Sequence, residues 1–582
     1  MSNLMSRRDV LAMPLAGIAA AALDPFEEAA AGEPAKDLPQ DPCALYPEVP
    51  GIACNTFRLP PEGLSSEARA RALEQLRNYQ SRRQSRFLGY QVNLNLAYEE
   101  DLRVFLNSTT NNIGDPFQTG HCTINTKWME RAVLDYYARL WNAKWPHNPN
   151  DPESYWGYVL TMGSTEGNLY GLWNGRDYLE GKCLLYESMP DASPPRLMCQ
   201  QPIAPKDNPN AFTPVVLYSE DTHYSIIKAI RVLGMRTFYE VGTSQYPGQC
   251  PLKGDKSWPT EVPSTDGDGG PGTIDLDALA RLVDFFAGKG HPILVNFNYG
   301  TTFKGAYDDV ERAGDVLLPI LRRHGLVDRV IARQGERTIK RDGFWFHVDG
   351  ALGASYMPFL EMAHKAGKIK QSGPKFDFRL PYVHSITMSG HKWLGAPRPC
   401  GVYMSKTKYL LLPPSRPHYI GSRDTTLAGS RNGFSAMVLW QYLATHSYEA
   451  QIAKALRLER LAEYAYRKLK ELESAQGPLW VARSPLSLAI WFKCPNPAIV
   501  FKYSLSTDSL VVDGSRRDYC HIYIMEHVTE ALIDELVADL SHSDSFDRRD
   551  VSLPLHPSET ESSGFEGFRS LVYVPETGRG MR

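Results

Sequence analysis

Ser-Ile-Thr-Met-Ser-Gly-His-Lys-Trp-Leu-Gly, residues 385–395, is the most informative stretch of this chain. A short apolar strand is predicted to end at Ser389-Gly390, which places the amine of Lys392 at a strand terminus beside a histidine. Such an amine can hold an aldehyde cofactor as a Schiff base while its neighbours bind the cofactor's phosphate. Desolvation disfavours a charged lysine, so an apolar setting makes Lys392 easier to deprotonate. Taken alone, the pattern also fits a surface lysine that follows a buried strand.

The stretch belongs to a long region of alternating strands and helices. Between about residues 155 and 412, short apolar strands alternate with helices, which is typical of a doubly wound α/β domain. The clearest strands are predicted at 215–218, 292–297, 344–348 and 385–388. Ligands bind such sheets beyond the carboxyl ends of the strands. The segments that follow these strands are therefore the candidate binding loops.

The pattern divides the chain into five predicted parts. They are a leader (1–35), an N-terminal arm with a helical segment (36–110), a large α/β domain (111–412), a smaller C-terminal α+β domain (413–540) and a polar tail (541–582). Helices are predicted near 68–79 and 128–141, and a long one at about 446–474, before strands near 486–493 and 519–525.

Composition limits the classes of function. With 582 residues, of which 43% are apolar, the chain can bury a large core, and a net charge of −3 gives no reason to expect a nucleic-acid partner. The nine cysteines form no CxxC pair, so neither a metal site nor a disulfide framework is expected, and Cys400 and Cys520 are interpreted as core residues. No long apolar run follows the leader, so no membrane association is expected.

The leader carries Arg7 and Arg8, a short apolar region and small residues near 29–31. This pattern resembles a Tat export signal of bacteria. The apolar stretch is too short to span a bilayer as a stable helix. The alternative is an Ala-rich leader on a cytoplasmic bacterial protein. Both locations stay open.

Gly-Ser-Thr-Glu-Gly-Asn, residues 163–168, follows an apolar segment and opens a predicted helix. Free backbone N–H groups at a helix start, with the hydroxyls of Ser164 and Thr165, form a suitable cradle for a phosphate. Ordinary helix capping is the alternative. His223, after the strand at 215–218, could stack on a heteroaromatic ring or transfer a proton, unless it is a capping or core histidine.

Asp349 lies at the end of the strand predicted at 344–348. A carboxylate there can pair with a protonated pyridine nitrogen and keep the ring an electron sink, and Ala351 is small enough to pack on a ring face. A helix-capping aspartate is the alternative. The segment 298–302 brings further hydroxyls, including Thr302, to the same edge, whereas Asp308 and Asp309 are expected to cap a helix.

Along the chain, the motifs follow the order phosphate loop, stacking histidine, hydroxyl loop, strand-end aspartate and Ser-x-His-Lys. In this order they make the chain resemble the group II pyridoxal-5′-phosphate (PLP) decarboxylases, in particular the bacterial histidine, valine and methionine decarboxylase-like branch. The resemblance spans roughly residues 85–530 and also rests on the segments 112–117 and 424–433. It implies PLP-dependent transferase fold type I (aspartate aminotransferase-like), with the large doubly wound domain and the smaller C-terminal domain. It further implies a homodimer with active sites at the subunit interface, where the loop 429–431 reaches the partner's site.

The resemblance also implies a role for each site residue. Lys392 forms the Schiff base with PLP, His223 stacks on the ring opposite Ala351, and Asp349 pairs with the ring nitrogen. The remaining residues hold the phosphate or approach a ring substituent; they are Ser164, Thr165, Ser389 and His391 for the phosphate and Thr302 for the ring.

The implied reaction is decarboxylation of an L-amino acid to CO2 and a primary amine. Many members of the family protonate the substrate carbon from a tyrosine on a long loop after the lysine. That interval is short in this chain, where Tyr419 is favoured over Tyr409 as the donor and His223 is the alternative. The apolar segments 87–92 and 117–122 are expected to shape the pocket. Arg423 and Arg431 are available to an acidic substrate, and a structural role is the alternative for both.

The apolar segments, together with the resemblance to the valine and methionine decarboxylases, favour an aliphatic substrate such as valine, leucine or methionine. Histidine or an aromatic amino acid is the nearest alternative. Another PLP lyase, an oxidative decarboxylase and a non-catalytic protein with the same fold are the alternatives of other classes.

Overall fold

The computed structural model describes residues 51–186, 197–252, 254, 256–334, 337–410 and 417–547. The predicted leader (1–35) and most of the predicted tail lie outside the described residues. The chain forms two compact units, of which the first has described residues 51–81 and the second 82–547. The first unit contains the 3-10 helix η3 (Cys54–Phe57) and most of helix α1 (Ser66–Gln84), where Thr56 Oγ1 donates a hydrogen bond of 2.8 Å to Gln75 Oε1.

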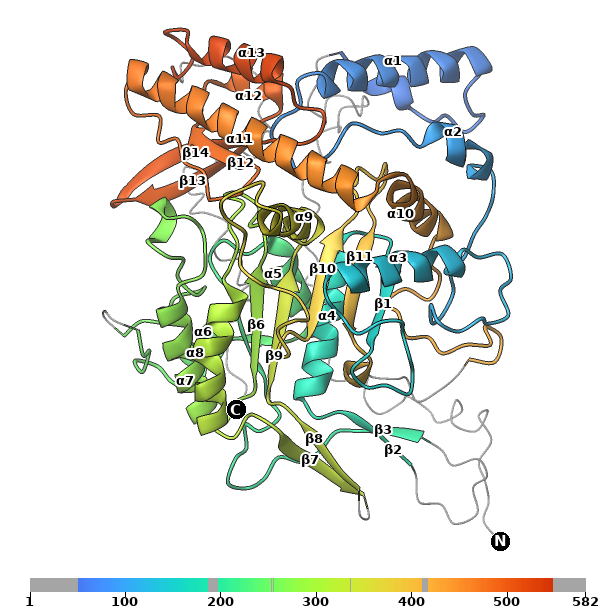
Figure 1. Cartoon of the computed structure of the whole chain (residues 1–582), viewed down its shortest axis with the longest axis vertical. Helices are drawn as coiled ribbons and strands as arrows, with labels where there is room; N and C mark the ends of the chain where they lie inside the picture. Colours follow the sequence, from blue (N-terminus) through green and yellow to red (C-terminus); the bar gives the residue numbers. More distant parts are fainter. Residues whose placement is uncertain are drawn as a thin grey trace, which may run out of the picture. The chain divides into compact units, whose positions relative to one another are not determined.

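A seven-stranded mixed sheet organises the second unit (Figure 1). In spatial order its strands are β1 (Tyr155–Leu160), β11 (Gly401–Lys406), β10 (Ser385–Ser389), β9 (Phe344–Asp349), β6 (Ile293–Asn298), β4 (Val215–Leu217) and β5 (Arg236–Thr237). Strand β11 runs antiparallel to both of its neighbours, and the other pairs are parallel. The four strands predicted in the α/β region are therefore confirmed.

Apolar side chains cover both faces of this sheet. On β6, Ile293, Val295 and Phe297 belong to one core cluster, whereas Leu294 between them belongs to another. The first face is covered by α3 (Lys127–Leu140), α6 (Phe238–Gln245), α7 (Leu276–Gly288), α8 (Val310–Arg323), α9 (Gly353–Lys365) and α10 (Gly433–Thr445). The second face is covered by α4 (Ser164–Leu179) and α5 (Tyr224–Leu233). Strands buried on both faces read as continuous apolar runs, and the predicted doubly wound arrangement is confirmed.

The C-terminal part is an α+β layer, as predicted. Helix α11 (Tyr448–Gln476) precedes a three-stranded antiparallel sheet with the order β12 (Ala489–Lys493), β14 (Ser515–Tyr523) and β13 (Ser506–Val512). Helices α12 (Pro497–Tyr503) and α13 (Glu530–Leu540) complete it (Figure 1). The boundaries of this domain at 413 and 540 stay predictions.

The remaining elements are short. They are α2 (Glu99–Leu102), η4 (Arg103–Phe105), η5 (Gly267–Gly269), η6 (Thr407–Tyr409), the hairpin of β2 (Cys183–Tyr186) with β3 (Leu197–Gln200) and the hairpin of β7 (Arg329–Gln334) with β8 (Arg337–Arg341). Cys400 and Cys520 are buried, as expected of core residues. No helix in the described part of the chain combines the length and the apolar character needed to cross a bilayer.

Candidate active site

Every predicted site residue except Tyr419 lines one pocket of about 210 Å³. The pocket lies at the carboxyl ends of β1, β4, β6, β9 and β10, which is the edge where ligands bind open α/β sheets. The predicted segment 298–302 also lines the pocket through Asn298, Gly300 and Thr301. The lining residues that no sequence motif predicts are Met162, Tyr224 and Pro399. The predicted segments 87–92 and 117–122 are not among the lining residues of this pocket.

The start of α4 forms a hydroxyl-rich corner of the pocket. Ser389 Oγ accepts a hydrogen bond from Ser164 N at 3.0 Å and donates one to Ser164 Oγ at 2.9 Å. Gly163 before them has φ +69°, and a Cβ at this position would approach His391 Cε1 to 2.7 Å. The ring nitrogen Nδ1 of His391 is buried without a hydrogen-bond partner. A bare backbone, serine hydroxyls at a helix start and an unpartnered ring nitrogen suit a phosphate group.

Glycines bring α4 directly onto the sheet. Gly167, Gly171 and Gly175 follow at intervals of four residues, so they share one face of the helix. A Cβ would meet Thr387 at Gly167, and would lie 2.7 Å from the His347 ring at Gly171 and 2.9 Å from the Trp345 ring at Gly175. This close approach places the polar first turn of α4 against the ends of β9 and β10.

Asp349 is the buried carboxylate of the pocket, with 5% of its surface exposed. Its Oδ1 accepts a hydrogen bond from Ala351 N at 3.2 Å, and its Oδ2 accepts one from Asn168 Nδ2 at 2.7 Å. Both donors are neutral. The carboxylate can therefore still accept a positively charged donor, such as a protonated pyridine nitrogen.

The amine of Lys392 is easier to deprotonate than a surface lysine. Burial lowers the pKa of Lys392 to about 8, against the opposing charge of Asp349. A lowered pKa raises the fraction of neutral, nucleophilic amine at physiological pH. The sequence-based expectation that the apolar setting would shift this residue agrees with the structure.

Both histidines of the pocket are neutral at pH 7. Burial, with a smaller contribution from the charge of Lys392, lowers the pKa of His391 to about 4. Burial also lowers the pKa of His223 to about 4, against the charge of Asp349. His223 caps α5, where its side chain accepts a hydrogen bond from Ser225 N. His223 therefore both caps α5, which is the alternative role predicted for it, and lines the pocket.

The two tyrosines weighed as proton donors lie outside the pocket lining. Tyr409 is buried against Tyr178, Trp345 and His384, and burial raises its pKa well above the usual value. Tyr419 is 81% exposed. Tyr409 is thus a core residue, and the role of Tyr419 stays a prediction.

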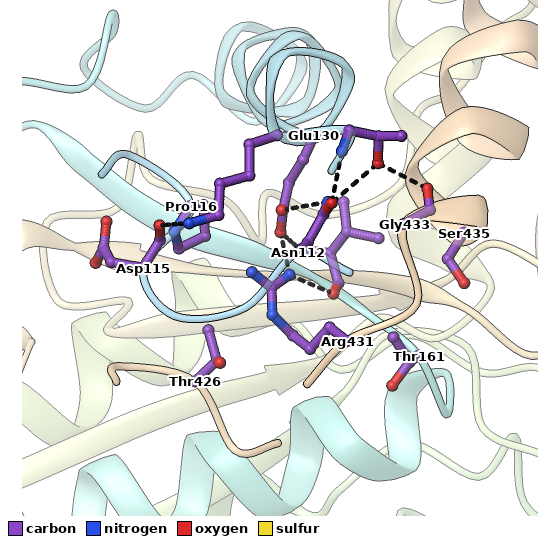
Figure 2. Close-up of polar contacts among 12 residues, drawn as sticks. Asn112, Asp115, Pro116, Glu130, Thr161, Thr426, Arg431, Gly433 and Ser435 are labelled. Carbon is purple, nitrogen blue, oxygen red and sulfur yellow. Dashed lines mark hydrogen bonds and ion pairs between the residues drawn. The ribbon is translucent and has the colours of Figure 1, made fainter. Parts of the chain in front are cut away.

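Arg431 is committed to its own chain (Figure 2). Its buried guanidinium pairs with the buried carboxylate of Glu130 on α3 and donates hydrogen bonds to Val159 O and Gly114 O. Glu130 Oε2 in turn accepts a hydrogen bond from Asn112 Nδ2 at 2.9 Å. Of the two alternatives for Arg431, the structural role therefore holds, since its charge joins α3 to the segment before α10 and is not available to an acidic substrate.

Of the two aspartates expected to cap a helix, Asp309 does so and Asp308 does not. Asp309 caps α8 and accepts a hydrogen bond from Arg312 N at 3.0 Å. Asp308 is buried and accepts hydrogen bonds from Ile274 N and Asn298 N, at 2.8 and 2.7 Å. Among the described residues, no group of three or more His, Cys, Asp or Glu side chains is placed to hold a metal ion.

Comparison with known proteins gives concordant matches. The pyridoxal-dependent decarboxylase conserved domain matches residues 265–478. A crystal structure of L-methionine decarboxylase from Streptomyces sp. 590 is 47% identical, with a TM-score of 0.77, and the match covers 84% of this chain and 97% of that chain. Histidine decarboxylase of Mesorhizobium japonicum is 30% identical over 78% of this chain and 93% of its own length. Histidine decarboxylase of Solanum lycopersicum is 28% identical over 79% and 85%.

Proposed function

Since the chain belongs to the pyridoxal-dependent decarboxylases, we propose that it removes the carboxyl group of an L-amino acid with an uncharged aliphatic side chain, such as methionine, leucine or valine. The protein is a carboxy-lyase of fold type I with PLP as its cofactor. Its product is the corresponding primary amine, formed together with CO2.

The charge of the pocket carries the proposal about the substrate. Apart from the neutral histidines and Tyr224, the lining residues with ionisable side chains are Asp349 and Lys392. Both are assigned to the cofactor. No further charge among the lining residues of one chain could pair with an acidic or basic substrate side chain. Met162, Tyr224 and Pro399 instead offer apolar surface. The 47% identity to an L-methionine decarboxylase supports the same class of substrate.

The roles that we propose for the residues follow from this geometry. Ser164, Thr165, Ser389 and His391 would hold the phosphate, Asp349 the protonated ring nitrogen, and His223 and Ala351 the two ring faces, with Thr302 near a ring substituent. Lys392 would bind the aldehyde carbon through its neutral amine. When bound, PLP supplies an electron sink for the pair of electrons left by departing CO2.

The donor of the final proton is a separate proposal. With a pKa near 4, His223 is a neutral imidazole at pH 7, so it offers a stacking surface and one N–H rather than an acidic imidazolium. We propose Tyr419 as the donor, brought to a pocket by closure of its segment or by a partner subunit. Tyr419→Phe should lower kcat by about 100-fold or more while it leaves PLP binding unchanged. Unchanged turnover in this variant would exclude Tyr419.

The deciding experiment measures CO2 and amine release across the twenty amino acids. We expect the highest kcat/KM with methionine, leucine or valine. Histidine is the second candidate because of the similarity to histidine decarboxylases, and a preference for histidine or for aromatic substrates would overturn the aliphatic proposal. Aldehyde with O2 uptake, in place of amine, would indicate oxidative decarboxylation.

We also propose that the protein is a homodimer. The adjoining segments 111–128 and 419–432 are joined by a hydrogen bond of 2.8 Å that His121 N donates to Ile420 O. Ile124 and Trp128 on the first segment and Tyr419 on the second are exposed. Such side chains favour burial against a second copy of the chain.

A further inference from the structure

Asn168 is a fully buried amide beneath the pocket, on the first turns of α4. Its Nδ2 donates a hydrogen bond of 2.7 Å to Asp349 Oδ2 and one of 2.8 Å to Ser225 Oγ. Its Oδ1 lies 3.0 Å from His347 Nε2. One side chain therefore connects the carboxylate of the pocket with the start of α5, which carries His223.

Chemistry sets the direction of every hydrogen bond in this chain of contacts. A carboxylate only accepts, so the amide nitrogen of Asn168 must face Asp349, and its second hydrogen goes to Ser225 Oγ. Because Ser225 Oγ accepts from Asn168, its own hydrogen is free for His223 Nδ1, 2.7 Å away. Ser225 N donates to the same nitrogen at 3.2 Å.

The consequence is a single tautomer of His223. Its Nδ1 accepts two hydrogen bonds, so the one proton of the neutral ring resides on Nε2, the nitrogen left for a ligand. The same reasoning applies to the buried His347. Its Nε2–H donates to Asn168 Oδ1, and its Nδ1 accepts from Ser385 Oγ at 2.8 Å.

We propose that Asn168 is a positioning residue that couples the two sides of the cofactor site. It holds Asp349 as an oriented carboxylate, and through Ser225 it keeps the proton of His223 on Nε2. This inference rests on the proposed placement of PLP between Asp349 and His223. Neither sequence pattern nor pocket lining points to Asn168, because it touches the residues that would contact the cofactor and not the pocket itself.

The test uses the apoenzyme, PLP and three variants. Asn168→Leu removes both donors at similar volume, and Asn168→Asp replaces them with a second carboxylate next to Asp349. Ser225→Ala breaks only the branch to His223. Asn174→Leu is the matched control, since Asn174 is buried on the same helix and donates only a long hydrogen bond, 3.4 Å, to Tyr403 OH.

Two readouts separate positioning from a general structural role. The first is the dissociation constant of PLP, which both Asn168 variants should raise by about 10- to 100-fold. The second is the ring tautomer of His223, measured in the apoenzyme by NMR of ¹⁵N-labelled histidine and assigned with His223→Gln. Wild type should show the Nε2–H form. Asn168→Asp and Ser225→Ala should raise the fraction of Nδ1–H, because without the hydroxyl donor only the longer contact from Ser225 N, 3.2 Å, still favours an accepting Nδ1.

Each outcome supports or overturns the proposal. Wild-type PLP affinity in both Asn168 variants, or an Nδ1–H tautomer in wild type, would overturn it. If the Asn168 variants do not fold, Ser225→Ala decides, since an unchanged tautomer there contradicts the relay. Asn174→Leu should change neither readout. Both readouts are independent of the amino acid substrate, and loss of PLP binding in Asp349→Ala and His223→Ala verifies the placement of the cofactor on which the inference rests.

Discussion

A lysine amine attacks an aldehyde only in its neutral form, so the surroundings of Lys392 set the pH at which the cofactor is bound covalently. With the pKa lowered to about 8 by burial, we expect the rate at which apoenzyme binds saturating PLP to rise with pH through about 8 and to level off above it. Stopped-flow absorbance of the cofactor measures this rate.

Two variants serve as controls for this pH profile. Asp349→Asn should move it to lower pH, because Asp349 raises the pKa of Lys392. Lys392→Ala should show no covalent reaction at any pH. A rate that still rises as the pH approaches 10.5, the usual pKa of lysine, would contradict the effect of burial on this amine.

At Gly163, backbone conformation and space both exclude a side chain. Gly163→Ala should lower PLP affinity by about 10-fold or more, because φ is +69° and the new Cβ would displace His391. Gly234→Ala is the matched control, since Gly234 has φ +62° with nothing within 4 Å. It should cost about 1 kcal/mol of unfolding free energy and leave PLP affinity unchanged. Equal PLP affinities in the two variants would contradict the role of the cradle.

At the level of residues, the sequence predicts the side chains that follow strands and line the pocket. It does not predict the residues that hold those side chains in place through hydrogen bonds. Asp349 and Lys392 were predicted because each follows an apolar strand whose carboxyl end faces the ligand edge. Asn168 lies four residues after Ser164 and Ser225 two after His223, but no sequence pattern gives either of them a role. Their function depends on contacts between α4, α5 and β9, which no local pattern contains.

Among the elements, α3 and the segment before α10 are joined by the buried pair Glu130–Arg431. Arg431→Met should lower the free energy of unfolding by about 3–5 kcal/mol, because it leaves a buried carboxylate without its cation. Chemical denaturation monitored by circular dichroism measures the loss. Arg467→Met is the control, since its pair with Glu471 is exposed on one helix and should be worth about 0.5 kcal/mol or less. Equal losses of unfolding free energy in the two variants would contradict the proposal that the buried pair stabilises the fold more than an exposed pair does.

Most strands that the sequence predicts are buried, but burial alone is not sufficient, since β11 (Gly401–Lys406) is buried throughout and is not predicted. Strands β4, β6, β9 and β10 are buried on both faces and gave apolar runs. The sequence pattern does not predict strand β13, because most of its residues are exposed. It does not predict the hairpin β7–β8 either, because strands such as Arg337–Arg341 are rich in arginine. Such strands are defined by their partners rather than by their own pattern.

For the molecule as a whole, the order of motifs along the chain predicted one pocket and one fold, and the structure brings those motifs together. What the order of motifs could not supply is the closure of that pocket. Tyr419 is exposed, and segments 87–92 and 117–122 do not line the pocket of one chain. A site that one chain leaves open on its rim is consistent with completion by a second subunit, which sequence patterning within one chain cannot show.

The oligomeric state tests this view of the whole molecule. Ile124 and Trp128 are 66% and 67% exposed and lie on the segments that we assign to the dimer interface. We expect wild type to sediment at twice the chain mass of 65.3 kDa, and Ile124→Glu with Trp128→Glu to sediment at the chain mass, since a specific interface does not tolerate two unpaired carboxylates at its centre. The matched control is Ile203→Glu, at a residue that is 95% exposed on another segment. If wild type is a monomer that decarboxylates its substrate, the second subunit is not required, and the proposal that a partner subunit brings Tyr419 to the pocket is overturned.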